Sequence, residues 1–246
     1  MTTAIARQRS SLGMGVFTLI VVCALVALGV WQLQRRAEKH ALIAALTERL
    51  SAAPLPLPPP TQWNALNAEH DEFRRVTVTA TFRDAPEAKV YAAGSALRSD
   101  IAGLGAFVFT PAALSDGVTV VVDRGFVPDG AKAAEAPHEP LALTGYLRFP
   151  EKSGWITPVP DVNKRLWFAR DQFDMAKTLS WGAVAPFYID LEAPAPASGL
   201  PKPGPLEVHL KDDHLQYAIT WFALAAAVAI AFAVWLRGRA RAEAAA

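Results

Sequence analysis

Two long apolar segments near the ends of the chain limit most strongly what it can fold into. Residues 12–33 and 215–236 each run for 22 positions without a formal charge and are rich in Val, Leu, Ile and Ala. A helix of that length measures about 33 Å, enough to cross a hydrocarbon layer of about 30 Å. Trp and Tyr near the ends of the segments suit the headgroup level of a bilayer. We therefore predict transmembrane helices over residues 12–33 and 214–236.

A cleaved signal peptide is the alternative for the first segment. Its apolar run exceeds the roughly 7–15 residues of a signal peptide. It is followed by Trp31-Gln32-Leu33-Gln34-Arg35-Arg36, which contains no small-residue cleavage site. The sequence therefore favours an uncleaved anchor.

Flanking charges predict the orientation of the two helices. The tail, residues 237–246, carries three Arg against one Glu, whereas Asp212 and Asp213 precede the second helix. Positive flanks stay in the cytoplasm, so we predict a cytoplasmic tail, and an even number of spans places residues 1–11 there too. The charges around the first helix do not favour one orientation, because basic residues lie on both sides of it. The segment between the helices is then expected outside the cytoplasm.

That intervening segment is predicted to have three parts. Residues 34–53 lack Gly and Pro and continue the first helix, and residues 54–60, Pro-Leu-Pro-Leu-Pro-Pro-Pro, form a stiff extended spacer. Residues 61–213 form a β-rich domain. Residues 37–213 hold 17 Lys+Arg against 22 Asp+Glu, which is typical of a solvated domain.

The β-rich domain is expected to contain short strands and one helix. In residues 74–82 apolar and polar side chains alternate, as in a half-buried strand. A helix is predicted over residues 171–180, with acidic residues in its first turn and Gly182 after it. Such a pattern favours an α+β domain with a small antiparallel sheet or a partly closed barrel. Further strands are predicted over residues 105–110, 118–127, 142–149, 166–170, 187–191 and 206–210.

Familiar enzyme and metal motifs are missing from the sequence. Ser95 and Ser153 stand outside any Gly-x-Ser-x-Gly or Ser-x-x-Lys pattern and are interpreted as turn serines. One cysteine, Cys23, excludes an intramolecular disulfide and a cysteine-based zinc site. A net charge of +1 gives no electrostatic case for nucleic acid. We expect neither an enzyme nor a nucleic-acid binder.

His214 occupies an unusual place, directly before the second apolar segment. At helical spacing it shares a face with Tyr217 and Trp221. An imidazole above an aromatic stripe could bind the iron of a haem. A His at a membrane interface is more commonly a polar flank, and spacing alone favours that interpretation.

Arg124 closes an apolar strand in Asp123-Arg124-Gly125-Phe126-Val127-Pro128. One interpretation is a local ion pair between Asp123 and Arg124, which contributes little if exposed. The other is an Arg that meets an anionic group such as a haem propionate. The sequence favours the first.

Six stretches of sequence resemble the surfeit locus protein 1 family, in the right order and around the same two-helix layout. The departures, Glu38 before Lys39 and Asp213 before His214, are surface-like. The stretches cover residues 29–35, 73–76, 109–111, 123–128, 145–151 and 214–222.

The resemblance implies a non-enzymatic assembly factor for cytochrome c oxidase in the bacterial inner membrane, with its main domain in the periplasm. It implies transient binding of haem a, with subunit I and the haem a synthesis machinery as partners. The histidine implicated in haem binding in bacterial members matches His214, which reverses the preference for a polar flank. Tyr217 and Trp221 would then flank the ring. For Trp31, Arg35 and Arg124, as candidate interaction residues, the family offers a motif but no settled role.

Two other functions stay open at this point. The chain could be a scaffold that holds subunit I during assembly and never touches haem. It could instead be an envelope sensor with a small-molecule site in the β domain. An enzyme is the least favoured interpretation.

Overall fold

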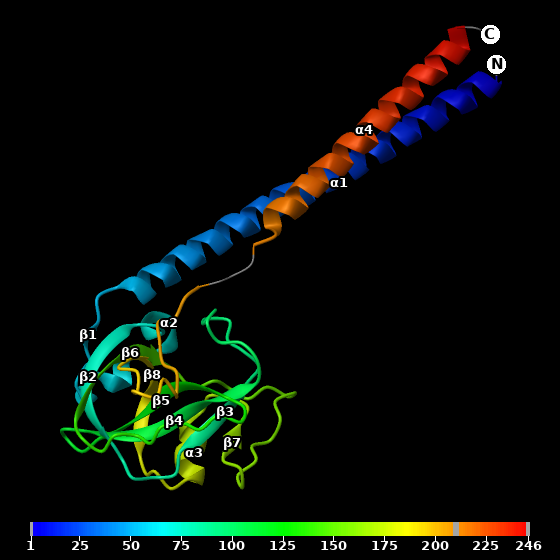
Figure 1. Cartoon of the computed structure of the whole chain (residues 1–246). Coiled ribbons are helices and arrows are strands. Elements are labelled where there is room, and N and C mark those ends of the chain that lie inside the picture. The colour runs from blue at the N-terminus through cyan, green and yellow to red at the C-terminus, as the bar shows by residue number, and fades with distance from the viewer. Residues whose placement is uncertain (1, 209–211, 245–246) are drawn as a thin grey trace. The chain divides into compact units, whose positions relative to one another are not determined.

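The computed structural model describes residues 2–208 and 212–244, which belong to two compact units (Figure 1). One unit comprises Met1–Ala44 and Leu210–Ala246, and the other comprises Ala45–His209. Each unit has its own internal packing. The first contains the apolar helices and the second contains the sheet.

Two helices are long and apolar enough to cross a membrane: α1 (Thr2–Ser51) and α4 (His214–Ala244). Only 6% of the most apolar window of each helix is buried. A core helix of a soluble protein buries such a surface, whereas a helix in lipid leaves it uncovered by protein. The prediction of two terminal apolar helices is confirmed, and their insertion into a membrane stays a prediction.

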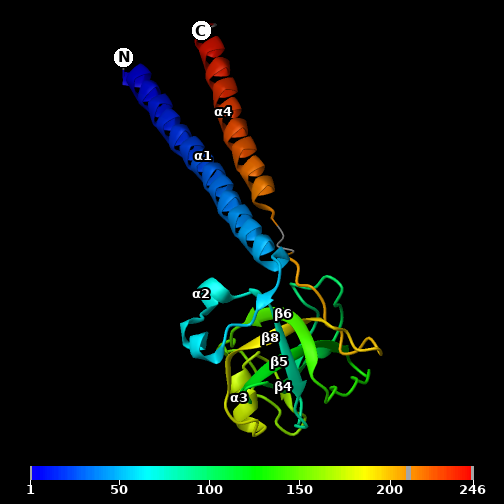
Figure 2. The same cartoon turned by 90° about the vertical axis from the view of Figure 1, so that its left-hand side faces the viewer.

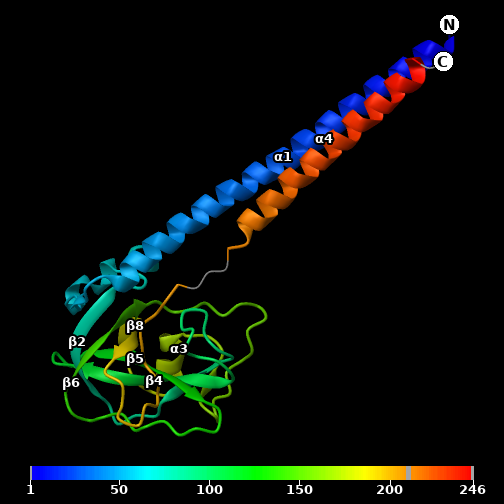
Figure 3. The same cartoon turned by 45° about the horizontal axis from the view of Figure 1, so that its top comes forward.

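The two helices contact each other through small residues. Gly29 of α1 is buried, and a Cβ atom at this position would lie 2.6 Å from the ring of Phe222 in α4. Ala218 and Ala225, one heptad apart on α4, are also buried. Small residues let helix backbones approach closely where no water drives association. The helices run side by side, with both chain ends at the same end of the pair (Figure 3).

Within residues 45–208, the second unit is built on one eight-stranded sheet of order β1-β2-β6-β8-β5-β4-β3-β7. Figure 2 labels four of these strands, β6, β8, β5 and β4. Three short helices accompany it: η1 (Pro60–Ala65), α2 (Ala68–Asp71) and α3 (Gln172–Thr178). The strands are β1 (Leu55–Pro56), β2 (Arg75–Phe82), β3 (Ala88–Ala92), β4 (Gly105–Leu114), β5 (Thr119–Pro128), β6 (Leu141–Arg148), β7 (Leu166–Trp167) and β8 (Val184–Ala193).

The sheet is mixed, which corrects the expectation of an antiparallel one. β8 pairs parallel with β5 and antiparallel with β6. At the two edges of the sheet, β1 pairs parallel with β2 and β7 pairs parallel with β3. Parallel neighbours need a long crossover, and the chain between β5 and β8, which contains β6, β7 and α3, supplies it. β2 also pairs with β4, so pairings link β2, β6, β8, β5 and β4 in a ring.

Six of the expected strands are found, and the helix expected over residues 171–180 is confirmed as α3. The prediction of a strand over residues 206–210 is wrong for residues 206–208, which form no strand. Residues 209 and 210 lie outside the described residues. β3 was not expected, because Ala88-Lys89-Val90-Tyr91-Ala92 contains one β-branched residue. The spacer 54–60 contributes β1, which pairs with β2.

The core below the spacer depends on Trp63 of η1. Its side chain is 5% exposed, and its ring meets Phe187 of β8 edge to face at 5.0 Å. Its indole Nε1–H donates to the carbonyl of Pro58 at 2.7 Å. One side chain thus joins the proline-rich segment to the sheet.

Trp63→Ala should lower the free energy of unfolding by about 3–5 kcal/mol, because it leaves a cavity and removes the aromatic contact. Urea titration of the full chain in detergent, followed by circular dichroism, measures the change. Trp155 is 97% exposed, so Trp155→Ala is the matched control and should shift stability by no more than about 0.5 kcal/mol. Equal effects of the two substitutions would contradict this account of the core.

Candidate functional site

His214 is the first residue of α4, and Asp212 holds its ring. Asp212 Oδ1 lies 2.8 Å from Nδ1 of His214 and also accepts the backbone N–H of His214 at 3.1 Å. The neutral tautomer that suits this contact carries its proton on Nδ1. That leaves the Nε2 lone pair of His214 for a metal, an arrangement in which the carboxylate fixes both tautomer and ring orientation.

Asp212 also joins α4 to α1. Its Oδ2 lies 2.6 Å from Nε2 of His40 and 3.6 Å from Nε of Arg36. Partial desolvation pushes the pKa of Asp212 upward, but hydrogen bonds from the backbone and ring of His214 and from His40 outweigh it. The pKa of this carboxyl therefore lies below its usual range, and Asp212 is ionised at neutral pH.

Tyr217 and Trp221 do not enclose His214 in a formed pocket. Tyr217 is 57% exposed and Trp221 is half-buried. The two aromatic side chains offer a surface beside the imidazole rather than a closed cavity. A neighbouring groove of about 400 Å³ includes none of the three residues and is lined by Asp212, Asp213, Leu215, Gln216, Ile219 and Thr220.

Trp31 and Arg35 lie together on the surface of α1. Trp31 is about half exposed, and the Arg35 guanidinium lies 5.9 Å from its ring centroid. Arg35 also pairs with Glu38 at 2.9 Å, and both side chains are exposed. An exposed pair of this kind contributes little to stability. Because both side chains are exposed, a partner could contact them.

Arg124 faces the interior of the β domain. It is 4% exposed, donates to Glu87 Oε1 at 2.5 Å and to the carbonyl of Ala134 at 2.9 Å. Its partner is therefore Glu87 and not Asp123, which corrects the expected local ion pair. Asp123 instead accepts the backbone N–H of Gly125 at 3.0 Å. The Arg124 charge is neutralised within the domain, which leaves it poorly placed to meet an external anion.

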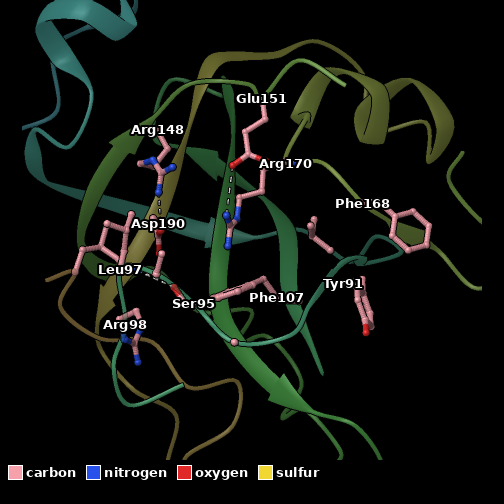
Figure 4. A pocket seen from close by; sticks show the side chains of 15 residues that line it. Tyr91, Ser95, Leu97, Arg98, Phe107, Arg148, Glu151, Phe168, Arg170 and Asp190 are labelled. Atoms are coloured by element: carbon pink, nitrogen blue, oxygen red, sulfur yellow. Dashed lines mark hydrogen bonds and ion pairs between the residues drawn. The ribbon is translucent and has the colours of Figure 1, made fainter. Parts of the chain in front are cut away.

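Asp123 and Asp190 form a buried acid pair that the sequence did not predict. They lie opposite each other on the parallel strands β5 and β8, and each is at most 5% exposed. Arg148 Nη1 lies 3.5 Å from Asp190 Oδ2, and Arg170 Nε lies 3.9 Å from Asp123 Oδ2. Two guanidinium groups thus flank two carboxyl groups inside the sheet, and Figure 4 shows three of these four side chains, those of Arg148, Arg170 and Asp190.

Burial dominates the titration of this pair. Desolvation, followed by the nearby charge of Asp190, raises the pKa of Asp123 to about 8, against the pull of Arg170 and Arg148. Desolvation also raises the pKa of Asp190. Two like charges so close cannot both ionise easily, so the pair keeps a proton at neutral pH. A charged residue inside an apolar strand, as in Val122-Asp123 and Ile189-Asp190, was the signal that could have revealed it.

A model of the SURF1 family matches residues 19–226 of the chain. The chain belongs to the SURF1 family. Surfeit locus protein 1 of Rattus norvegicus is 32% identical over 250 residues, which cover 96% of this chain and 78% of the rat protein. The Homo sapiens protein of that name is 33% identical over 237 residues, or 89% and 77% of the two chains. A SURF1-like protein of Monosiga brevicollis is 33% identical over 225 residues, or 85% and 81%.

The SURF1 family match includes both clusters described above. It contains His214 with Asp212, and it contains the acid pair with its two arginines. The resemblance seen in the sequence is therefore confirmed. Arg148 and Glu151 come from one of the stretches that carried it, residues 145–151, and both line one cavity of the β domain.

Asp123→Asn should flatten the pH dependence of stability. Folded Asp123 keeps its proton up to pH about 8, whereas in the unfolded chain it loses the proton near its usual pKa of 3.8. Between these values the folded state binds more protons, so the free energy of unfolding falls as pH rises, by up to about 1.4 kcal/mol per pH unit. Asn retains the oxygen that accepts from Gly125 but cannot ionise. Urea midpoints at pH 5 to 8 measure the slope.

The matched control is Asp129→Asn, at an exposed position just after β5. It should keep the wild-type slope. Identical slopes for wild type and Asp123→Asn would contradict a protonated acid pair.

Proposed function

We propose that this chain is an assembly factor for cytochrome c oxidase that holds haem a at His214 before its insertion into subunit I. Membership of the SURF1 family supports the assembly role. The contact between Asp212 and His214 is the observation that carries the haem proposal, because it leaves the Nε2 lone pair of His214 available to coordinate iron. Haem iron commonly takes a neutral imidazole as an axial ligand.

The residues around His214 fit a flat apolar cofactor held for a limited time. Tyr217 is exposed and Trp221 is half-buried, so a ring lying along α4 could contact both without displacing packed side chains. An open surface site favours moderate affinity, which a carrier needs because it must release its cargo. The role requires binding and release and no catalysis, so we propose a chaperone and not an enzyme.

The proposed location is the inner membrane of a bacterium, with α1 and α4 as its two spans. Both chain ends lie at the same end of the helix pair (Figure 3), which agrees with both termini in the cytoplasm. The Arg-rich tail supports that side, and the β domain is then periplasmic. In this location the chain could receive haem a from its synthesis machinery and meet subunit I within the bilayer.

A scaffold that holds subunit I without binding haem is the second candidate. The loop between β6 and β7 favours it, because Trp155, Ile156 and Val159 are 97%, 74% and 86% exposed. Neighbouring exposed apolar side chains commonly mark a contact with another protein or a membrane.

The full chain purified in detergent from cells that make haem a should carry that haem, and His214→Ala should lose it. The pyridine-haemochrome spectrum identifies and quantifies the cofactor. His138→Ala is the matched control, because His138 is exposed in the β domain, and it should keep the wild-type haem content. A wild-type protein without haem would contradict the haem proposal and favour the scaffold. Normal oxidase assembly in cells that carry His214→Ala would have the same consequence.

Asp212→Asn should weaken haem binding by about 10–100-fold while leaving His214 in place, because the amide cannot fix the imidazole as a carboxylate does. Titration of the purified apoprotein with haem, followed by the Soret band, measures the affinity. Asp116→Asn, in an exposed turn of the β domain, is the control. An unchanged affinity for Asp212→Asn would show that Asp212 does not position the ligand.

A further inference from the structure

A polar cavity of about 390 Å³ lies in the β domain, beside the acid pair (Figure 4). Cavities of this size suit small organic molecules. Arg148 and Asp190 reach it from β6 and β8, and Glu151 and Arg170 from the loops that follow β6 and β7. The turn at residues 94–98 covers another side. The cavity belongs to the second unit alone and is independent of the proposed haem site.

Two of its three arginines, Arg148 and Arg170, make fewer side-chain hydrogen bonds than the third, Arg98. Arg98 is bonded to Asp100 and to the carbonyls of Pro203 and Gly204, so it holds its own loop. Arg148 donates through Nε to Glu72 at 2.6 Å and reaches Asp190 through Nη1. A guanidinium carries five N–H donors. Among the described residues, Nη2 of Arg148 has no hydrogen-bond partner.

Arg170 is less satisfied still. Its Nη1 reaches Glu151 at 3.4 Å, while its buried Nε has no hydrogen-bond partner within the described residues. The buried Asp123 Oδ2 and the Tyr188 hydroxyl share this condition, but neither residue lines the cavity. Each such atom costs about 1–3 kcal/mol unless a water or a ligand atom supplies the bond. The end of the cavity lined by Arg148 and Arg170 therefore offers N–H donors to the polar atoms of a ligand.

The outer part of the cavity is apolar and aromatic. The rings of Tyr91 and Phe168 lie 6.0 Å apart, and Phe107 supports the Arg170 guanidinium from 4.5 Å. Figure 4 shows Tyr91 and Phe168 together, away from Arg148 and Asp190. A ligand that fills the cavity would thus need a charged or polar end and an apolar body.

The geometry of the lining favours a planar monoanion. Each of the three arginines is already paired with an acid, Arg98 with Asp100, Arg148 with Glu72 and Arg170 with Glu151, so the lining has no large surplus of positive charge for a dianion. A phosphate dianion would meet the two acids of the lining at close range. A carboxylate is planar and accepts two N–H donors from a guanidinium fork, so it matches the available groups.

We propose that this cavity binds a small molecule with one carboxylate and an apolar, flat body. The carboxylate accepts from Arg148 and Arg170, and the body lies against Tyr91 and Phe168. Glu72 and Glu151 orient the two guanidinium groups and leave their other edges to the ligand. This assigns a binding site to the β domain in addition to any role of His214.

The test uses the full chain in detergent with three fluorinated probes: 4-fluorobenzoate, 4-fluorophenylacetate and the neutral 4-fluorobenzamide. Fluorine NMR of the probes measures binding directly. The two carboxylates should bind with millimolar or better affinity, and the amide should bind at least about tenfold more weakly. Acetate, which lacks the apolar body, and inorganic phosphate should compete poorly.

Arg170→Lys and Arg148→Lys keep the charge but remove the planar fork, and each should weaken carboxylate binding at least about tenfold. Arg165→Lys is the matched control at an exposed position and should bind like wild type. Phe168→Ala, in the outer wall, should weaken both carboxylates without affecting acetate. Thermal unfolding confirms that each variant is folded.

Four outcomes would overturn the proposal. The first is that neither carboxylate binds at concentrations up to about 10 mM, the weak limit for a fragment. The second is that the neutral amide binds as tightly as the carboxylates. The third is that inorganic phosphate displaces the probes as effectively as the carboxylates displace each other. Wild-type affinity in a folded Arg170→Lys variant would also exclude the assigned site. None of these results bears on haem content, so this proposal and the haem proposal can fail separately.

Discussion

The high cost of removing charge from water is the constraint on which the β domain depends. Several of its arginines are almost fully buried, and two of them, Arg124 and Arg148, are held by acids from a different part of the chain. Arg148 of β6 joins Glu72 near α2 to Asp190 of β8, and Arg124 of β5 is held by Glu87 before β3. A buried charge without its partner would destabilise the fold by several kcal/mol, so these pairs fix which strands and loops lie together.

The helix pair is built on a different principle. Its outer surface is apolar and uncovered by protein, and its contacts use small residues such as Gly29 against Phe222. One cluster of polar side chains lies where α4 begins and contains His214, Asp212 and His40. In an apolar setting such a polar group is costly unless it serves binding or is satisfied locally, and here Asp212 satisfies both imidazoles.

The two candidate sites share one arrangement. In each, a carboxylate orients a nitrogen-containing side chain and leaves its other nitrogen atoms available to a ligand. Asp212 does this for His214, and Glu151 does it for Arg170. The first arrangement leaves a metal-binding nitrogen, and the second leaves anion-binding donors.

The sequence by itself determined the two apolar helices, most strands, α3 and the family, because these follow from local periodicity, length and short motifs. It did not determine the mixed sheet, the partner of Arg124 or the cavity with its acid pair. Asp123 and Asp190 stand 67 positions apart in the chain and meet only because β5 and β8 pair in parallel. Which charges become neighbours depends on strand order and register, and those are set by packing of the whole domain and not by any local pattern.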